Sequence, residues 1–189
     1  MSQETIARIA YVSLFAGTQD IRYYLNGVCL QNNAEGLYAV ATNGYVLSYA
    51  KLGDKLEGED FEIILPNSAA KIIASCKERF GLDLEYERDT KQVSIKTQEG
   101  TQTLKAIEGK YPDWRRVVPL SRQKLEEDQR LGMSTKYLAY LDKAYKAFKK
   151  HSEGMLEGCE MEYYGYSSAM IFRPEGVKDI TVLIMPRRV

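Results

Sequence analysis

The residue types that carry out catalysis are scarce in this sequence, and their spacing forms no recognised catalytic group. His151 is the one histidine, so any Ser/His/Asp arrangement would have to be built around a single side chain. The sequence contains no glycine-rich phosphate loop and no Cys/His spacing suited to zinc. General acid–base catalysis needs paired groups close together, and the spacing indicates no such pair. We therefore expect a binding protein rather than an enzyme, with no cofactor and no bound metal.

Three carboxylates form the one pattern that could bind a cation. Asp83, Glu85 and Glu87 alternate along a predicted strand, and this alternation places them on the same face. A solvated strand face explains the pattern more simply than a metal cluster does. We therefore expect these side chains to face solvent.

Composition and charge restrict the class further. Lys+Arg and Asp+Glu each total 26, which argues against wholesale polyanion binding but allows a local basic face. No apolar run approaches a membrane span, and the first residues lack the basic start and apolar middle of a signal peptide, so we expect a cytoplasmic protein that does not bind membranes. The cysteines are odd in number and widely spaced, which predicts buried free thiols at Cys29, Cys76 and Cys159.

The elements that would position the candidate residues repeat one plan, a helix followed by strands. Helices are predicted over residues 5–16, over 67–81 with Asn67 as N-cap, and over 134–151 with Ser134 or Thr135 as N-cap. Alternating apolar runs between turn signals predict strands within residues 22–31, 36–52, 59–66, 82–90, 92–98, 101–109, 158–166, 167–174 and 180–189. The helices begin at nearly even intervals, so the chain reads as three copies of one α+β unit.

An acidic segment without periodicity divides these units as two plus one. It predicts a domain of two units over residues 1–119, a linker over 120–130 and a half domain over 131–189.

The third helix has the clearest amphipathic pattern. Its apolar arc, expected to face the core, consists of Tyr137, Leu141, Ala144, Tyr145 and Phe148. The opposite face is basic and carries Lys136, Lys143, Lys146 and Lys150.

Several segments, in order along nearly the whole chain, resemble one known family. They are QDIRYYLNGV at 19–28, LYAVATNGYVLSYAKL at 37–52, EIILPNSAAKII at 62–73, IEGKYPDWRRVVP at 107–119 and ITVLIMPRRV at 180–189. Together they are similar to the β sliding clamp of bacterial replicative DNA polymerase, whose rings are built from such helix-plus-strands units. The resemblance implies a DNA clamp fold of about one and a half clamp domains. It covers the middle domain and the second half of the last one, and this set of units cannot build the family's ordinary dimeric ring.

The resemblance also implies a pocket in which family members bind short apolar peptides of polymerase and repair proteins. Carried over position by position, that pocket would consist of Leu25, Thr42, Gly44, Leu47, Pro112, Arg116, Val117, Tyr137, Ser168, Leu183, Ile184, Met185, Pro186 and Arg187. Leu, Val, Ile, Met and Pro suit aliphatic or aromatic anchors, Thr42 and the Gly44 backbone could orient a peptide, and Tyr137 could act as a lid. The alternative is that the apolar members are simply core.

Two departures from the family bear on this pocket and on DNA. Tyr45 and Val46 replace what is commonly a His-Arg pair at the pocket rim, so the peptide preference is expected to differ. Asn67 and Ser68 replace a basic pair at the start of the second helix, which weakens the expected phosphate-binding surface.

The resemblance implies DNA contact at the loop that contains Gln19, Arg22, Tyr23 and Tyr24. An arginine there could neutralise a phosphate, and the tyrosines could stack on bases or pack against sugars. The alternative is an ordinary strand in which Tyr23 points inward and Tyr24 outward. Lys136, Lys143, Lys146 and Lys150 would add weak, salt-sensitive double-stranded DNA binding, although a solvated face explains them too.

Two binding functions remain open at this point. In the first, several chains assemble as a homo-oligomeric minimal clamp, because four chains of three units each would match the unit count of a full ring. In the second, a ringless clamp mimic captures DNA polymerase or repair proteins that carry clamp-binding peptides, as a prophage or mobile element would use. The molecular mass in solution separates the two.

Overall fold

The strands of this chain form two antiparallel sheets. The computed structural model describes residues 1–76, 82–121, 132–152, 158–165, 167–177 and 179–187. Its strands are β1 Gly27–Asn33, β2 Gly36–Thr42, β3 Val46–Gly53, β4 Phe61–Pro66, β5 Asp83–Glu87, β6 Gln92–Thr97, β7 Gly100–Lys105, β8 Cys159–Glu162, β9 Met170–Pro174 and β10 Ile180–Ile184. The helices are α1 Gln3–Ser13, α2 Asn67–Ser75 and α3 Thr135–Lys149, with 3-10 turns η1 Tyr23–Leu25 and η2 Trp114–Val117.

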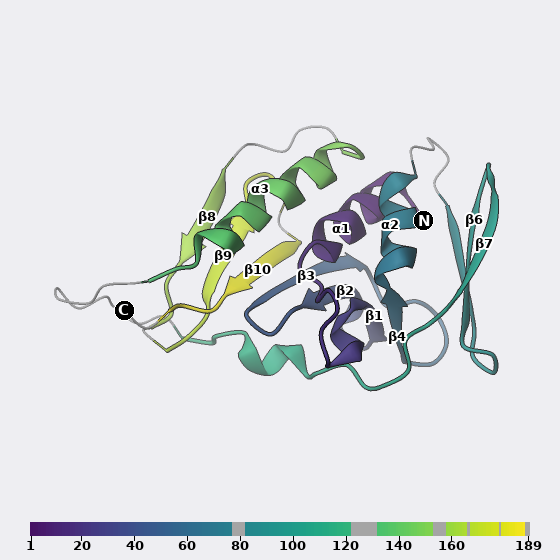
Figure 1. Cartoon of the computed structure of the whole chain (residues 1–189), viewed down its shortest axis with the longest axis horizontal. Coiled ribbons are helices and arrows are strands. Elements are labelled where there is room, and N and C mark those ends of the chain that lie inside the picture. Colours follow the sequence, from purple (N-terminus) through teal and green to yellow (C-terminus); the bar gives the residue numbers. More distant parts are fainter. Residues whose placement is uncertain (77–81, 122–131, 153–157, 166, 178, 188–189) are drawn as a thin grey trace.

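The larger sheet joins segments from both ends of the chain (Figure 1). Its seven strands run in the order β4-β1-β2-β3-β10-β9-β8, and the smaller sheet has the order β5-β6-β7. β3 and β10 pair antiparallel, with Leu47 opposite Leu183 and Val46 opposite Ile184. The predicted domain 1–119 and the predicted half domain 131–189 therefore contribute strands to one continuous sheet.

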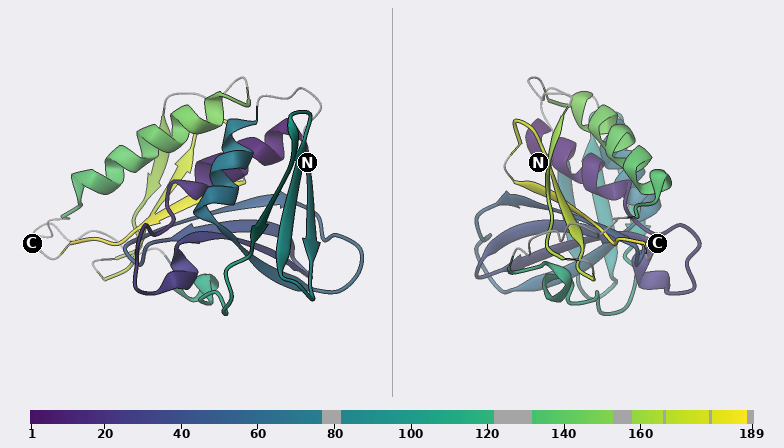
Figure 2. Two further views of the ribbon diagram at one scale, coloured as in Figure 1. Left: turned by 45° about the vertical axis from the view of Figure 1, so that its right-hand side comes forward. Right: turned by 90° about the vertical axis from the view of Figure 1, so that its left-hand side faces the viewer.

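The three helices cover one face of the large sheet (Figures 1 and 2). α1 lies between α2 and α3, and its Tyr11 ring meets the Phe148 ring of α3 edge to face at 6.4 Å. Within the predicted apolar arc of α3, Ala144 and Phe148 are buried and the other members are partly buried against the same core. The arc prediction is confirmed, because 3.6-residue periodicity places these side chains on the stripe that faces α1.

The opposite face of the sheet carries a second, smaller core under the segment that contains η2. Trp114 packs on Tyr49 with ring centroids 4.6 Å apart, and Tyr111 is also buried there. The Arg115 guanidinium lies over the Trp114 ring at 4.3 Å and donates to Gln31 Oε1 of β1 at 2.6 Å. These contacts fix η2 against the outer face of β1 and β3.

The predicted strand over residues 22–31 is wrong in its first half. Residues 23–25 form the 3-10 turn η1, and β1 begins only at Gly27. The Asn26 side chain accepts from the Asp20 N–H and donates to the Asp20 carbonyl, both at 2.9 Å. This side-chain closure of the loop competes with extended backbone. Tyr23 is consequently exposed rather than turned into the core.

Three further expectations are corrected. Pro66, not Asn67, is the N-cap of α2, and the Asn67 side chain instead donates to the Gly17 carbonyl at 2.8 Å. α2 ends at Ser75, while the remainder of its predicted range, 77–81, lies outside the described residues. Cys159 is exposed, since β8 is an edge strand, although all three thiols are free as expected. Most of the predicted linker also lies outside the described residues.

Candidate peptide-binding site

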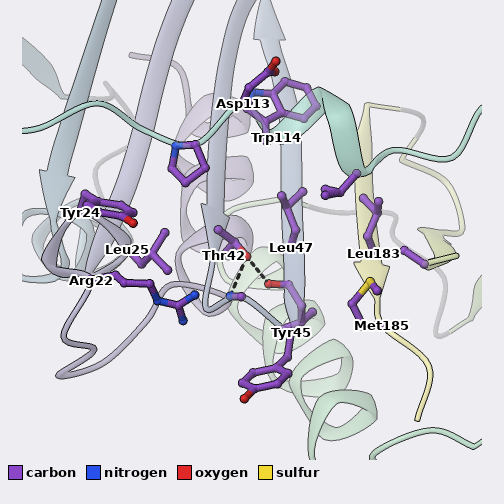
Figure 3. Close-up of a pocket in the computed structure, with 15 residues that line it drawn as sticks. Arg22, Tyr24, Leu25, Thr42, Tyr45, Leu47, Asp113, Trp114, Leu183 and Met185 are labelled. Atoms are coloured by element: carbon purple, nitrogen blue, oxygen red, sulfur yellow. Dashed lines mark hydrogen bonds between the residues drawn. The ribbon is translucent and has the colours of Figure 1, made fainter. Parts of the chain in front are cut away.

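The C-terminal strand and the turn between β2 and β3 lie side by side and form one end of an apolar pocket (Figure 3). The ladder between β3 and β10 ends at Ile184, and the Met185 N–H then donates to the Tyr45 carbonyl at 3.0 Å. The pocket has a volume of about 300 Å³ and is open to solvent. Residues 183–185 therefore lie beside residues 42–47, and the pocket that both segments line is apolar.

Hydrogen bonds within the turn fix its shape. The Thr42 hydroxyl donates to the Val46 carbonyl at 2.8 Å and accepts from the Gly44 N–H at 3.0 Å. The Asn43 side-chain oxygen accepts from the N–H groups of Tyr45 and Val46. Thr42 and the Gly44 N–H were expected to orient a peptide, but they bond to each other and hold the turn. Orientation of a peptide would have to come from other groups.

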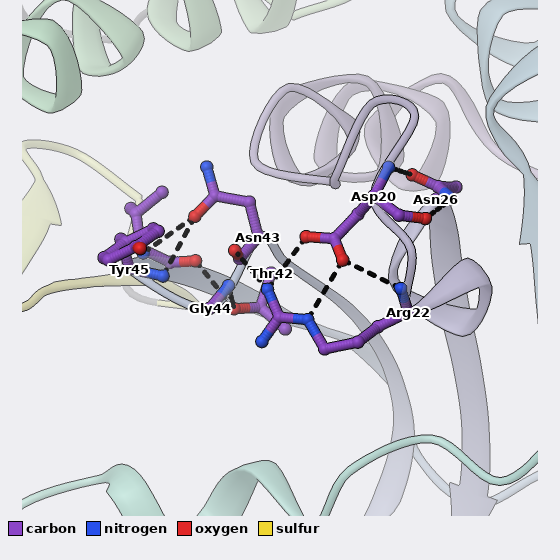
Figure 4. A network of polar contacts seen from close by, with 8 residues as sticks. Asp20, Arg22, Asn26, Thr42, Asn43, Gly44 and Tyr45 are labelled. Carbon is purple, nitrogen blue, oxygen red and sulfur yellow. Dashed lines mark hydrogen bonds and ion pairs between the residues drawn. The ribbon is translucent and has the colours of Figure 1, made fainter.

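Arg22 lies at the pocket rim rather than on a separate surface, and its polar contacts hold it there (Figure 4). Its guanidinium makes two hydrogen bonds to the Asp20 carboxylate, at 2.8 and 3.0 Å, and one to the Asn43 carbonyl at 3.2 Å. Hydrogen bonds from the Arg22 side chain and backbone lower the pKa of Asp20 to about 2, and the same pair raises the pKa of Arg22. The Asp20 carboxylate therefore holds the Arg22 guanidinium beside the apolar slot and offsets its charge.

The wall opposite this rim comes from η2 and the residues before it. Trp114 is buried beneath the pocket, whereas Val117 is 51% exposed and forms part of its lip. Pro112 and Asp113 line the same wall. The hydrogen bond from Arg115 to Gln31 anchors this wall to β1.

Most residues of the expected pocket are brought together. The members that line it are Leu25, Thr42, Gly44, Leu47, Pro112, Val117, Leu183 and Met185. The expected members that do not line it are Arg116, Tyr137, Ser168, Ile184, Pro186 and Arg187.

The structure shows where several of these non-lining residues lie instead. Ile184 is fully buried in the main core, because strand alternation turns it away from the face that Leu183 presents. Arg187 pairs with Gly132 through its backbone, past the end of the pocket. Arg116 is on the exposed side of η2, and Ser168 is next to the lining residue Ala169.

Tyr137 does not line the pocket but contacts Tyr45, which does. Its ring stacks on Tyr45 with centroids 6.1 Å apart and an interplanar angle of 17°. Burial, followed by the neighbouring phenols Tyr45 and Tyr140, raises the pKa of Tyr137. Tyr45, which is 63% exposed, stands where the family commonly has the histidine of a His-Arg pair, and in this chain it forms an aromatic stack with Tyr137.

Sequence reasoning did not place Arg22, Tyr24, Asp113, Trp114 and Ala169 in the pocket. Arg22 and Tyr24 had been assigned to DNA contact. The buried aromatic in the PDWRR segment was the available signal for the wall, because a large aromatic among charges commonly anchors a loop to a sheet. Ala169 gave no signal, since a small residue before a strand has no distinctive pattern.

The expected DNA-contacting residues fall into two separate groups. Gln19 and Tyr23 are exposed on the η1 loop, where Tyr23 meets Tyr24 edge to face at 5.7 Å. The lysines belong to α3, whose first turn approaches the turn between β2 and β3, because Lys136 lies over the Tyr137 ring and that ring stacks on Tyr45. The four expected lysines, Lys136, Lys143, Lys146 and Lys150, are exposed, as is Lys149, and Lys146 is paired with Asp142 at 2.8 Å.

The described residues contain no group of three or more metal-ligating side chains. Asp83, Glu85 and Glu87 are exposed on one face of β5, as expected for a solvated strand. His151 bonds through Nε2 to the Ala74 carbonyl at 2.9 Å and so connects the end of α3 to α2. Across the described part of the chain, no helix is long and apolar enough to span a membrane.

Solved structures define the class of protein. The chain aligns over 100% of its length with the DNA polymerase sliding clamp of Pseudomonas aeruginosa solved with a ligand, at a TM-score of 0.76 and 19% identity, and covers 65% of that chain. The polymerase III beta protein of Caulobacter crescentus aligns equally well, at a TM-score of 0.76 and 20% identity, again over 100% of this chain and 65% of the other. The fold is that of a DNA clamp.

Sequence comparison identifies the family within that class. The family described as DNA polymerase III beta subunit, central domain, matches residues 1–113, so this chain belongs to the bacterial DNA polymerase III beta subunit family. The beta sliding clamp of Pseudomonas aeruginosa is 31% identical over 131 residues, which are 66% of this chain and 35% of the relative. That of Haemophilus influenzae is 27% identical over 128 residues, 67% of this chain and 35% of the relative. The chain thus spans about a third of the curated relatives' length.

Proposed function

We propose that this chain is a non-enzymatic, sliding-clamp-like protein of DNA replication whose pocket binds short peptide motifs of polymerase and repair proteins. The observation that carries the proposal is the pocket itself. An apolar slot of about 300 Å³, built from Leu47, Leu183 and Met185, lies beside the Arg22 guanidinium, which Asp20 holds in place. Sites of this size and lining bind small apolar side chains through burial and use a few polar groups for orientation.

The shape of the pocket indicates the kind of peptide it would accept. Leu25, Leu47 and Leu183 are buried at its base, so an aliphatic or aromatic side chain would be desolvated on entry. Met185 is 41% exposed and flexible, which suits varied partners. Asp20 offsets the charge of Arg22, so Arg22 at the rim would serve the peptide as a hydrogen-bond donor rather than as a free positive charge.

A second candidate shares this pocket but differs in assembly. In that candidate the chain is a ringless mimic that sequesters clamp-binding partners of a host, as a prophage or mobile element would use. Asn67 and Ser68 at the start of α2 give that helix no cation in its first turn. This weakens the expected attraction for DNA, which a mimic does not need and a ring does.

Sedimentation equilibrium separates the two candidates. A minimal clamp predicts a stable homotetramer, in which four chains supply the units of a ring. A monomer at micromolar concentration supports the mimic and excludes the ring at that concentration.

The pocket is tested with a fluorescent clamp-binding peptide and charge-inserting variants. Met185→Asp and Val117→Asp place a carboxylate in the pocket, and we expect each to weaken peptide binding by at least ~10-fold, or about 1.4 kcal/mol. Both positions are well exposed, so the fold should survive. The measurement is fluorescence anisotropy.

Leu120→Asp provides the matched control, since Leu120 is 99% exposed, lies three residues after Val117 and does not line the pocket. It should bind the peptide like the wild type. Equal binding by all three variants would show that the peptide binds elsewhere.

A further inference from the structure

The strand before α2 shows how this fold completes the sheet beside a helix. β4 runs directly into α2 and pairs antiparallel with β1, with Pro66 opposite Gly27 and Leu65 opposite Val28. The Asn67 N–H adds a hydrogen bond to the Asn26 carbonyl at 3.2 Å. β4, α2, β5, β6 and β7 follow one another along the chain. The strand before the helix, β4, closes one edge of the large sheet.

A similar strand-like contact precedes α1. The Met1 amino group donates to the Leu82 carbonyl, and the Leu82 N–H donates back to the Met1 carbonyl at 3.3 Å. Such a reciprocal pair is the hydrogen-bonded rung of an antiparallel ladder. Leu82 immediately precedes β5, and the N-terminus lies close to the small sheet in Figures 1 and 2. Met1 therefore stands beside β5 much as Pro66 stands beside β1.

Beyond this rung, the edge of β5 is open within the described part of the chain. β5 pairs with β6 on one side, and no described strand occupies its other side. Because backbone groups alternate along a strand, the N–H and C=O groups of Leu84 and Tyr86 face the same way as those of Leu82, toward the open side. An edge of this kind is a template for another strand.

An apolar groove of about 600 Å³ lies along that edge. Leu84 and Tyr86 line one side, and Leu30, Phe61 and Ile63 of the large sheet line the other. The groove is where the inward side chains of an added strand would lie. Its apolar lining would be buried by them, which favours the addition.

The outward face of β5 carries the opposite chemistry. Asp83, Glu85 and Glu87 are exposed there, and Lys96 pairs with Glu85 at 2.5 Å. Asp83 and Glu87 have no ion-pair partner among the described residues. Side chains directly opposite across an antiparallel pair share a face, and opposite charges there stabilise the pair. Basic residues opposite these carboxylates would therefore stabilise an added strand.

We propose that the β5 edge is a second binding surface, which takes up an extended segment of another polypeptide as an added antiparallel strand with alternating apolar and basic residues. The apolar residues lie opposite Leu84 and Tyr86 and enter the groove. The basic residues lie opposite Asp83, Glu85 and Glu87. Main-chain hydrogen bonds supply affinity in this mode, and the alternating side chains supply specificity. The surface is separate from the pocket beside Thr42.

The test uses a fluorescein-labelled six-residue peptide in which lysine alternates with phenylalanine or isoleucine. A control peptide of equal composition groups its three lysines before its three apolar residues. We expect the full chain to bind the alternating peptide at least ~10-fold more tightly, measured by fluorescence anisotropy. Equal affinity for both peptides would overturn the proposal, because only alternation fits a strand.

Two kinds of variant locate the binding site. Leu84→Pro removes an N–H that faces the open side, and the double variant with Asp83→Lys and Glu87→Lys reverses the outer charges. Each should weaken binding by ~10-fold, and the double variant should also reduce its salt dependence. The double variant with Glu99→Lys and Glu160→Lys makes the same change in net charge at exposed sites outside the groove, and should bind like the wild type. Unchanged binding by Leu84→Pro and by the Asp83/Glu87 variant would overturn the assignment.

Further experiments identify what binds in the groove. Met185→Asp should leave alternating-peptide binding unchanged, so this surface and the peptide pocket can fail independently. Fusing the alternating six residues directly before Met1 should fill the groove and abolish binding of the free peptide. A dimer that forms without peptide and is lost in Leu84→Pro would show that a second copy is the occupant, and would overturn the choice of a separate polypeptide.

Discussion

Gly44 is the residue on which the shape of the pocket rim depends most directly. Its φ of +89° lies in the region that favours glycine, and a Cβ there would come within 2.8 Å of the Arg22 guanidinium. The turn that contains Gly44 positions Tyr45 against β10, and Arg22 occupies the space that a side chain would take. The missing side chain therefore allows an arginine and an apolar slot to lie in contact.

Replacing Gly44 tests this relation. We expect Gly44→Ala to lower the free energy of unfolding by about 1–2 kcal/mol, because alanine is strained at this φ, and to weaken peptide binding by displacing Arg22. Urea unfolding and peptide anisotropy measure the two effects. Gly53→Ala is the control, since a Cβ at Gly53 meets nothing within 4 Å. If Gly44→Ala binds peptide normally, the position of Arg22 does not matter for the pocket.

The Asp20–Arg22 pair should make stability depend on pH in the acid range. Hydrogen bonds from Arg22 lower the Asp20 pKa from 3.8 to about 2 on folding, so the unfolded chain binds a proton at higher pH than the folded one. The stabilisation is complete above the unfolded pKa and disappears as pH falls through about 2. As the pH is lowered between these two values, the melting temperature of Asp20→Asn should fall less than that of the wild type. Parallel curves would contradict the role of this pair.

At the scale of elements, local patterns predicted what each segment is but not what it pairs with. Alternation predicted β5, β6 and β7, and 3.6-residue periodicity predicted the buried stripe of α3. The pairing of β3 with β10 joins segments more than a hundred residues apart, and no local pattern encodes such a partner. Resemblance to the family placed residues from both segments in one pocket, which is why most of the pocket was foreseen.

The errors have local physical causes. Residues 22–26 have strand-forming side chains, but Asn26 closes a loop through its own side chain. Leu183 and Ile184 were both assigned to the pocket, although strand alternation allows only one of them to face it. Leu183 lines the pocket, whereas Ile184 is buried in the main core.

The packing of α3 on α1 gives an element-scale prediction. Phe148 is 2% exposed and meets Tyr11, so Phe148→Ala should lower the free energy of unfolding by about 3–5 kcal/mol through the cavity that it leaves. Leu138→Ala on the same helix removes a side chain that is 38% exposed and should cost much less. Urea unfolding compares them. Equal losses would mean that α3 is not held by its buried stripe.

At the scale of the whole molecule, basic charge is distributed unevenly over a chain with no formal net charge. The exposed lysines of α3 lie on the helical side of the large sheet, and Asp142 is the one acidic residue of that helix. Asp142 neutralises Lys146, so Lys136 and Lys143 are chosen for the test of this helix. Any attraction for DNA through α3 should therefore be weak and sensitive to salt.

Charge reversal at both lysines tests this attraction. The double variant with Lys136→Glu and Lys143→Glu should bind duplex DNA more weakly, with a slope of log affinity against log salt reduced by up to about 1.8 if each lysine contacts one phosphate. Lys96→Glu with Lys105→Glu, on the small sheet, is the control with the same change in net charge. Identical slopes for both variants would exclude α3 as a DNA contact.

The pairing of β3 with β10 also sets when the pocket can exist during synthesis. β3 leaves the ribosome early, but β10, at residues 180–184, is made more than a hundred residues later. Until then the nascent chain presents β3 as an uncovered strand and has no slot for a peptide. A polypeptide terminated before β10 could form the helices and the β4-β1-β2-β3 part of the sheet, yet it would recruit no partner through this pocket.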